Sequence, residues 1–563
     1  MFRENTKHLQ QNLFEFRNDL PKKLQKKLDE SKESKFYELI FCNIKEEDFE
    51  CLYSETDSRP NSPVNALVTS LILIQKENFT YEELFENIHF NLLTKTALGL
   101  KKIDEVPFCP ATIFNFQNRL AKHYSETGEN LLEKEFDNLT AEQIKELKIK
   151  ANIQRTDLFF AASNIRNYSR LQLLVEMLIR LYRILDETDK EYFRDLLEPY
   201  VNNTSENYIY NIKASEIPHH IKKLGDIYYR LYEQIKAKYS ENSIFKIFER
   251  IYKEHFKVKN KKITVKKPEE LKSSSIQSPD DIEATYRNKN GKKSKGQSIN
   301  IFETANPENQ INLITDVSVQ ANNVNEDKIL NNRIDKVKDK TPDLEELHFD
   351  AGYGSSENDK MLEESQITTV QTGIKGPPAK VNIKIEKHNE NQYRVSCPKQ
   401  SVLSQTCKKR EKAQYNLKIC STCSLSSECL TIKAKKSRVY YFTKADYLQK
   451  KRLNSINKIP AERRKLRNNI EATTWEFIRK MPNKKLKVRG YFKTAIFAYT
   501  AAIAINFGRI FRYLPELNRK SVQATCFFAQ FVKEQFLFLF KFFYYVLSLK
   551  FQSKLSIQKF HTY

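Results

Sequence analysis

LEELHFDAGYGSSENDKMLE (residues 344–363) predicts a short strand, a sharp turn and a helix, in that order. Its first apolar residues alternate with polar ones, the two glycines permit the turn, and Ser356 with Asp359 is typical of a helix cap. Asp350 therefore falls at the carboxyl edge of a sheet, where open α/β sheets bind ligands. It is a candidate metal ligand, although an aspartate that only hydrogen-bonds the turn gives the same pattern.

A second aspartate, Asp157, lies near the end of another extended stretch, LKIKANIQRTDLFF at residues 147–160. The residues after it change to helical period, with one leucine stripe over residues 163–185 and arginines outside the stripe. Helical character continues to about residue 256. So long a block predicts an all-helical insertion after the first strand, whose arginines either face DNA or form a solvated helix face.

Strand patterns return after this block. Residues 298–304 and 311–319 alternate on either side of an Asn-Pro turn, which predicts a hairpin. A helix over 326–337, the Asp350 strand and a further apolar strand at 366–372 follow. This order predicts a mixed sheet with helices packed on it.

The third acid, Glu471, lies on a predicted helix in PAERRKLRNNIEATTWEFIRKM, residues 460–481. Arg467 and Glu471 share the face beside the core stripe, so the acid lies at the rim of the core. An ordinary surface ion pair has the same spacing. Residues 492–511 predict an alanine-bearing helix that covers the sheet. The loop before that helix is basic and contains Lys484, Lys485, Lys487 and Arg489.

Cysteines concentrate between the last two acids. Five of the nine lie there, namely Cys397, Cys407, Cys420, Cys423 and Cys429. A disulfide framework for a chain of 563 residues would be spread more widely. Thiolates at a C-x-x-C spacing hold one tetrahedral ion when two further thiolates close the shell. A local metal site is therefore expected, with a cluster of buried thiols as the alternative.

Helix signals begin at residue 60. Ser62 and Pro63 start one helix, Thr80 and Glu83 form a capping box for a second, and Pro110 opens a third. A compact three-helix unit with basic flanks is compatible with a helix-turn-helix that reads DNA, and also with a small bundle that binds no nucleic acid. The basic flanks are Lys95, Lys101, Lys102, Arg119 and Lys122.

The formal charge of +24 and the pI near 9.3 favour a polyanionic partner, nucleic acid rather than a membrane surface. Abundant lysine and asparagine from coding bias would raise the charge as well. The first residues lack the apolar core of a secretory signal, so a cytoplasmic protein is expected. Apolar stretches at 494–507 and 536–549 are too short to span a membrane, and Lys541 breaks the second.

Together, three segments resemble the DDE transposases of bacterial insertion sequences, in the branch that carries a cysteine cluster between its last two acids. The segments are QRTDLFFAASNIRNYSRLQLLVE (154–176), LHFDAGYGSSEND (347–359), and RNNIEATTWEF (467–477) with KLKVRG (485–490). SPDDIEATYRNKNGKKSKGQSINIFET (278–304) is similar to the segment that leads into that branch's second strand. The resemblance covers residues 60–511.

The resemblance implies a ribonuclease H-like core in which Asp157, Asp350 and Glu471 hold two Mg²⁺ or Mn²⁺ ions. Such a core cleaves DNA and transfers strands. Arg467 and the basic loop at 484–489 are the expected DNA contacts. The family's cluster also favours one structural Zn²⁺, with Cys407 outside the site. Its expected ligands are Cys397, Cys420, Cys423 and Cys429.

The chain also departs from the family. Leu158 follows the first aspartate, where members often have serine or threonine. A tyrosine, arginine, glutamate, lysine signature is only partly met. Arg467 lies four residues before Glu471 as the signature requires, but Arg464 occupies its tyrosine position and Ile478 its lysine position. These departures leave the three acids intact and concern the finer DNA contacts.

Double-stranded DNA is the expected partner, both as transposon ends and as target. Since one chain carries one triad and a transposon has two ends, a homodimer or larger assembly on DNA is expected. The helical insertion and the aromatic tail at 527–545 are the candidate contact surfaces between chains. The alternatives are a transposase-derived DNA-binding protein with weak or no catalysis, and a metal-dependent nuclease.

The predicted fold is α/β, a ribonuclease H-like mixed sheet with helical and cysteine-rich additions. The expected parts are a polar N-terminal region (1–58), a helical DNA-binding domain (59–146), a catalytic core (147–162, 296–380 and 455–512), a helical insertion (163–257), a basic linker (258–295), a zinc-binding insertion (381–442) and an aromatic tail (513–563).

Overall fold

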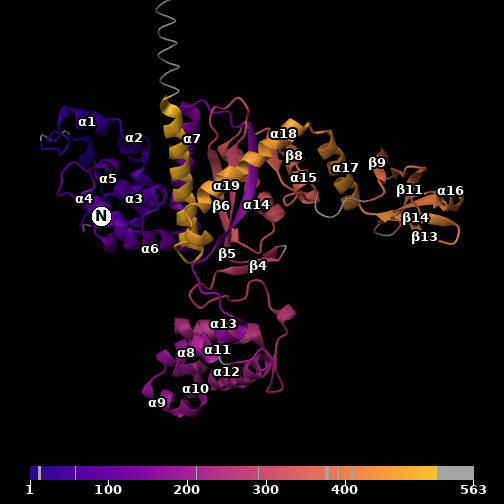
Figure 1. Cartoon of the computed structure of the whole chain (residues 1–563), viewed down its shortest axis with the longest axis horizontal. Coiled ribbons are helices and arrows are strands. Elements are labelled where there is room, and N and C mark those ends of the chain that lie inside the picture. Colours follow the sequence, from indigo (N-terminus) through magenta and orange to yellow (C-terminus); the bar gives the residue numbers. More distant parts are fainter. Residues whose placement is uncertain are drawn as a thin grey trace, which may run out of the picture. The chain divides into compact units, whose positions relative to one another are not determined.

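A six-stranded mixed sheet carries the strands predicted around the aspartates (Figure 1). Its order is β4-β5-β1-β7-β8, with β6 on β5. The strands are β1 (Ile153–Ala162), β4 (Thr285–Lys289), β5 (Lys292–Thr304), β6 (Ile314–Ala321), β7 (Glu346–Phe349) and β8 (Thr368–Gln371). The β1–β7 and β7–β8 pairs are parallel and the others antiparallel. The predicted hairpin is confirmed as β5–β6, and the mixed α/β fold class is confirmed with it.

The computed structural model describes residues 1–10, 14–56, 59–210, 212–289, 291–374, 380–389, 392–407 and 410–515. Residues 1–506 form one compact unit and residues 507–563 a second. The aromatic tail from residue 516, including the apolar stretch at 536–549, lies outside the described residues.

Helices accompany the sheet where the sequence predicts them, with two local corrections. The cap before α15 is Ser355, not Ser356, since the Ser355 side chain accepts from the Asn358 N–H. The single helix predicted over 460–481 is broken at Leu466–Asn469, which forms a 3₁₀ turn. The predicted helices are α14 (Glu326–Lys340), α15 (Ser356–Glu364), α18 (Ala461–Lys465) and α19 (Ile470–Ile478). A further helix, α17 (Lys444–Lys458), was not predicted.

The first 150 residues are helical. The predicted capping box of Thr80 and Glu83 is confirmed, and Pro110 begins α6 as expected. Residues before 59 were predicted as a polar region, but they also contribute to the core, because Phe36 and Phe41 are fully buried. The helices are α1 (Lys22–Asp29), α2 (Lys32–Leu39), α3 (Val64–Glu77), α4 (Tyr81–Phe90), α5 (Leu92–Ala97), α6 (Pro110–Thr127) and α7 (Leu131–Glu146).

After β1 the chain forms six helices with their own core. The predicted leucine stripe is confirmed, since Leu171, Leu174, Leu178 and Leu181 are all buried in that core. The helices are α8 (Arg170–Ile184), α9 (Glu187–Tyr192), α10 (Arg194–Val201), α11 (Ser205–Tyr210), α12 (Ile217–Tyr239) and α13 (Ser243–His255). The segment expected as a linker instead holds the hairpin β2 (Phe256–Lys259) and β3 (Lys262–Val265), then β4. FKVK in β2 and KITV in β3 do alternate, but strands of four residues surrounded by lysines are also typical of a polar linker.

A second six-stranded sheet, in the order β13-β14-β12-β11-β10-β9, contains the cysteine-rich region. Its small core includes Ile383, Val395 and Tyr415. The elements are β9 (Lys384–Asn389), β10 (Gln392–Ser396), β11 (Ser401–Cys407), β12 (Arg410–Asn416), α16 (Leu417–Ser421), β13 (Ile432–Lys433) and β14 (Ser437–Phe442).

The alanine-bearing helix runs from Tyr491 to Pro515. As predicted it packs on the sheet, because Asn506 pairs with both the N–H and the C=O of Ile314 in β6. Among the described residues it is the one helix long and apolar enough to cross a membrane, but 83% of its apolar window is buried inside the protein. Helices buried in a protein core meet the same criteria of length and hydropathy.

Glu135 on α7 offers a test of packing in the N-terminal helices. The residue is fully buried, and burial raises the pKa of its carboxyl from 4.5 to about 8. The folded state therefore holds a proton that the unfolded state releases, so stability falls as the pH rises from about 4.5 through 8. Glu135→Gln should be about 3 to 5 kcal/mol more stable than the original chain at pH 9, and much closer to it at pH 5.

Thermal unfolding at the two pH values checks this expectation. Glu142→Gln, an exposed acid on the same helix, is the control and should show no such pH dependence. Equal melting temperatures for Glu135→Gln and the original chain at pH 9 would contradict it.

Candidate active site

Asp157 and Asp350 lie on neighbouring parallel strands. The register pairs Gln154 with Leu347 and Arg155 with His348. Continuing it by two residues places Asp157 beside Asp350, the first residue after β7. The prediction that Asp157 ends its strand is wrong, because β1 continues to Ala162 through antiparallel pairing with β5. Beside the shorter β7, however, Asp157 still lies at the edge of the parallel part of the sheet.

Asp350 also makes the turn bond of the simpler interpretation. Its Oδ1 accepts a hydrogen bond of 2.7 Å from the Gly352 N–H. One carboxylate oxygen can hold the turn while the other remains for a ligand. The two interpretations of this aspartate are therefore compatible.

Glu471 and Asp157 contact the same arginine, Arg467. Glu471 lies in the first turn of α19, which contacts β1 (Figure 1), and its side chain is 66% exposed. The Arg467 guanidinium lies 2.9 Å from Asp157 Oδ2 and 3.8 Å from Glu471 Oε1. A carboxylate from β1 and one from α19 thus contact the same cation, although more than 300 residues separate them in the chain.

The pKa of Asp157 depends on the charges of Asp350 and Glu471. Burial is the main cause that raises it, to about 6. The Arg467 charge and the Leu158 N–H, which donates to Asp157 Oδ1 at 2.8 Å, lower it. The carboxylates of Asp350 and Glu471 raise it again. The three predicted acids therefore interact electrostatically.

A buried polar network joins the elements that carry Asp157 and Glu471. Arg155 on β1 pairs with Glu303 on β5 at 2.5 Å, and both side chains are almost fully buried. Glu303 Oε2 accepts from Thr473 on α19 at 2.6 Å, and Arg155 donates to the Leu466 carbonyl at 2.7 Å. No sequence pattern predicts this network, because its members come from three segments that are far apart in sequence.

A fourth acid, Glu326, lies next to Asp350. A Cβ built on Gly352 would lie 1.9 Å from Glu326 Oε2 and 2.8 Å from Asp350 Oδ1. The two oxygens are therefore no farther apart than the sum of these distances. Glu326 is almost fully buried and pairs with Lys289 at 2.9 Å. A glutamate is common in the first turn of a helix, so no separate sequence pattern identifies Glu326 at the start of α14.

The described residues include no group of three His, Cys, Asp or Glu side chains arranged to hold a metal ion. The three acids are close enough to perturb one another but are not gathered around one point. Their donor chemistry nevertheless fits Mg²⁺ or Mn²⁺, which take carboxylate oxygens as ligands.

The basic residues predicted to contact DNA make contacts within the chain. Lys484 lies 5.8 Å from the centre of the Trp475 ring, and Lys485 donates to the Ile165 carbonyl. Lys487 donates to the carbonyls of Asn78 and Phe79, and Arg489 to that of Asn164. The loop thereby joins α19 to other segments of the chain, and a DNA-binding role for it stays a prediction.

Four of the five clustered cysteines line one small cavity. They are Cys397, Cys420, Cys423 and Cys429. Burial raises the pKa of the Cys420 thiol, and the nearby Cys397 and Cys429 raise it further. Cys407 is exposed at the end of β11 and does not line the cavity. These are the four sulfurs named by the zinc prediction, but among the described residues they do not form a group arranged to hold a metal ion, so the zinc site stays a prediction.

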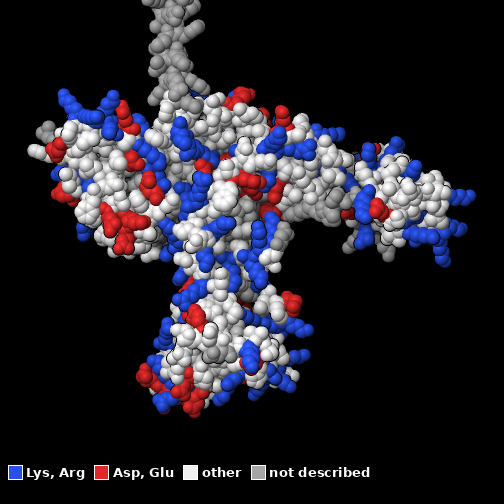
Figure 2. Space-filling view, viewed as in Figure 1, with Lys and Arg blue, Asp and Glu red and all other residues white. Residues whose placement is uncertain are grey.

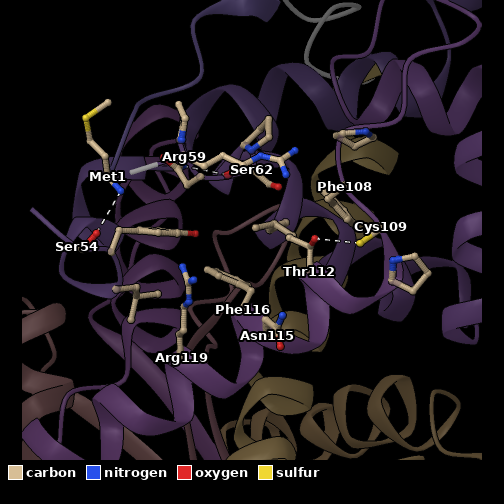
Figure 3. A pocket seen from close by; sticks show the side chains of 18 of the residues that line it. Met1, Ser54, Arg59, Ser62, Phe108, Cys109, Thr112, Asn115, Phe116 and Arg119 are labelled. Carbon is tan, nitrogen blue, oxygen red and sulfur yellow. Dashed lines mark hydrogen bonds between the residues drawn. The ribbon is translucent and has the colours of Figure 1, made fainter. Parts of the chain in front are cut away.

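The N-terminal helices border a separate cavity of about 1180 Å³ (Figure 3). Phe116 and Arg119 of α6 line it, and the Arg119 guanidinium lies 4.9 Å from the centre of the Tyr53 ring. Of the predicted basic flanks, Arg119 and Lys122 line this cavity. Lys95 is buried and donates to the Glu105 carbonyl, so it is not available to DNA.

Two family models match parts of the chain. The first, described as a transposase DDE domain, covers residues 390–511, which include the four cysteines of the cavity and Glu471. The second, described as a transposase domain (DUF772), covers residues 19–119. It includes residues 19–58, to which the sequence analysis assigned no function. No curated protein and no solved structure matches the chain.

Both matches are to transposase domains, and they lie on either side of the strands that carry Asp157 and Asp350 in the sequence. Neither match covers Asp157 or Asp350 themselves. Both family models indicate a DDE transposase of an insertion sequence.

Proposed function

We propose that this transposase binds the ends of its insertion sequence and catalyses metal-dependent DNA cleavage and strand transfer. The observation that carries the proposal is the shared guanidinium of Arg467, which contacts Asp157 and Glu471 while Asp350 lies beside Asp157. We assign the catalysis to a ribonuclease H-like core made of residues 147–162, 296–380 and 455–512. The alternatives are a DNA-binding descendant without catalysis and a nuclease that only hydrolyses DNA.

Asp157, Asp350 and Glu471 would hold Mg²⁺ or Mn²⁺ in this proposal. When bound, two such ions activate the attacking oxygen and stabilise the leaving oxygen. The reaction needs no covalent protein nucleophile: water frees a 3′ hydroxyl at the element's end, and that hydroxyl attacks a phosphodiester of the target. Because the pKa of Asp157 is about 6, this carboxyl is mostly ionised near neutral pH and is then able to act as a ligand.

In this proposal, basic side chains bind the DNA backbone. Lys and Arg are spread over the face shown in Figure 2, with acidic side chains between them. The net charge of +24 gives an attraction for phosphates that weakens as salt is added. We assign end recognition to the helices within residues 59–146, where Arg119 and Lys122 line the cavity of Figure 3. With DNA as its partner, the protein would act in the cytoplasm.

An end-joining assay separates the three candidate functions. The protein is incubated with Mg²⁺, a target plasmid and labelled DNA from the borders of its own element. Labelled ends joined to the plasmid support the proposal. Ends that are cut but never joined would favour the nuclease, and bound but uncut ends would favour the DNA-binding descendant.

We further propose that the cysteine-rich insertion, residues 381–442, holds one structural Zn²⁺. Protein purified without chelator should contain about one equivalent of zinc, and Cys423→Ser should lower this below half. Cys407→Ser removes a thiol from the same sheet but not from the cavity, so it is the control and should keep its zinc. Equal zinc contents in the two variants would contradict the assignment.

The active species should be a dimer or larger on DNA, since joining both ends needs two active sites. In a mixture of equal amounts of active and Asp350→Ala chains, joining of both ends should fall to about a quarter. The joined products are counted on gels from labelled ends. The control mixture contains Asp343→Asn chains, which lack only an exposed carboxylate before β7. A fall to one half, in proportion to the active chains, would contradict the assembly.

A further inference from the structure

The hairpin β4–β5 is strongly basic. Residues 285–298 contain no acidic residue, and their cations are Arg287, Lys289, Lys292, Lys293 and Lys295. Lys289 and Lys292 are cross-strand partners, and Asn288 is the partner of Lys293. Both Lys292 and Lys293 are exposed. No carboxylate among the described residues forms an ion pair with either of them.

The two faces of this hairpin have different surroundings. Cross-strand partners lie on the same face, as do residues two apart in one strand. Arg287, Lys289 and Lys292 therefore share one face, and Lys293 and Lys295 share the other. Lys295 donates to the carbonyl of Tyr168 at 3.3 Å, so its face turns toward the segment before α8.

The first face is tied to the turn that carries Asp350. Lys289 Nζ donates to Glu326 Oε1 at 2.9 Å, and Glu326 Oε2 lies over Gly352 beside Asp350. Arg287 donates to the carbonyls of Asn322 and Val324, which lead into α14. Glu326 thus compensates the cation at the base of the face, while Lys292 lies beyond it and forms no ion pair with a carboxylate that the structure describes.

An exposed lysine on a hairpin usually has water as its only partner. Three observations distinguish Lys292: it lies on the face turned toward the catalytic turn, its neighbour Lys289 is fixed by a buried glutamate, and the hairpin offers no acid to pair with it. The anion that must enter this region during the reaction is the phosphate backbone of DNA.

We propose that Lys292 binds a backbone phosphate of the DNA strand that enters the acidic centre, and that Glu326 positions the hairpin for this contact. The inference rests on the proposed function and adds a substrate-binding element to it. Lys292 acts as a point charge, so the contact is independent of base sequence. Lys293 on the other face does not take part.

The test compares Lys292→Ala with Lys293→Ala, which remove the same charge from adjacent exposed positions. Fluorescence anisotropy measures binding to a labelled duplex from the border of the element in a salt series. One lost phosphate contact lowers the slope of log affinity against log salt by about 0.9. Lys292→Ala should show this decrease, and Lys293→Ala should keep the slope of the original chain.

The charge reversal Lys292→Glu should weaken binding at low salt about tenfold relative to Lys293→Glu. Equal slopes for the two alanine variants, while the original chain binds and joins its ends, would overturn this inference and leave the proposed function intact. Failure of the original chain to bind its own ends would overturn both.

Discussion

Asp350→Asn should reduce the joining of DNA ends by about a thousandfold or more while leaving DNA affinity within a few-fold of the original. The substitution keeps the size of the side chain and its ability to accept the Gly352 N–H, but removes the negative charge. An amide oxygen is a weaker ligand than a carboxylate for a hard divalent cation. The expected loss therefore falls on the chemical step rather than on folding or binding.

Joined products from labelled ends give the rate, and anisotropy gives the affinity. Asp157→Asn and Glu471→Gln should show losses of the same order, since we propose that all three acids hold the same pair of ions. Asp343→Asn, an exposed position shortly before β7, is the control and should remain active. Full activity in any of the three acid variants would remove that residue from the centre.

Arg467→Ala should reduce joining by about a hundredfold, because a misplaced catalytic group commonly costs that much. Its guanidinium contacts Asp157 and Glu471 and is mostly buried. Without that cation, only the Leu158 N–H still opposes burial and the other acids, so the pKa of Asp157 rises above the value of about 6 in the original chain. An acid with a higher pKa needs a higher pH to ionise.

The acid limb of the pH–rate profile should therefore move to higher pH in Arg467→Ala. Arg467→Lys keeps a charge but loses the planar guanidinium that contacts both acids. Its acid limb should lie between those of the original chain and Arg467→Ala. Arg479→Ala, an exposed arginine at the end of α19, is the control and should leave the profile unchanged. A drop in rate with no change in the acid limb would assign Arg467 to DNA contact alone.

Local patterns predicted much of this fold. The capping box at Thr80, the hairpin β5–β6 and the strand before Asp350 each depend on residues close together in sequence. Such local patterns can be recognised without knowledge of the tertiary structure. They placed the three acids on the elements where the structure has them, apart from the extension of β1 past Asp157.

The features that were missed depend on contacts between distant segments. Glu326 was assigned only to a helix start, yet its carboxylate lies against Gly352. The pair of Arg155 and Glu303 joins residues 148 positions apart. Neither has a sequence pattern of its own, because charged residues on buried strands are recognised only when their partner is known. β4 was also not predicted, because its residues, TYRNK, lack the apolar alternation of a strand.

The most direct test of the active centre is a crystal structure of the protein with Mn²⁺ and a cleaved end of its element. Anomalous scattering locates the ions independently of the protein coordinates. The account predicts two ions about 3.5 to 4 Å apart, with Asp157, Asp350 and Glu471 all among their ligands. Ions bound at other residues, or one of the three carboxylates without contact to either ion, would contradict it.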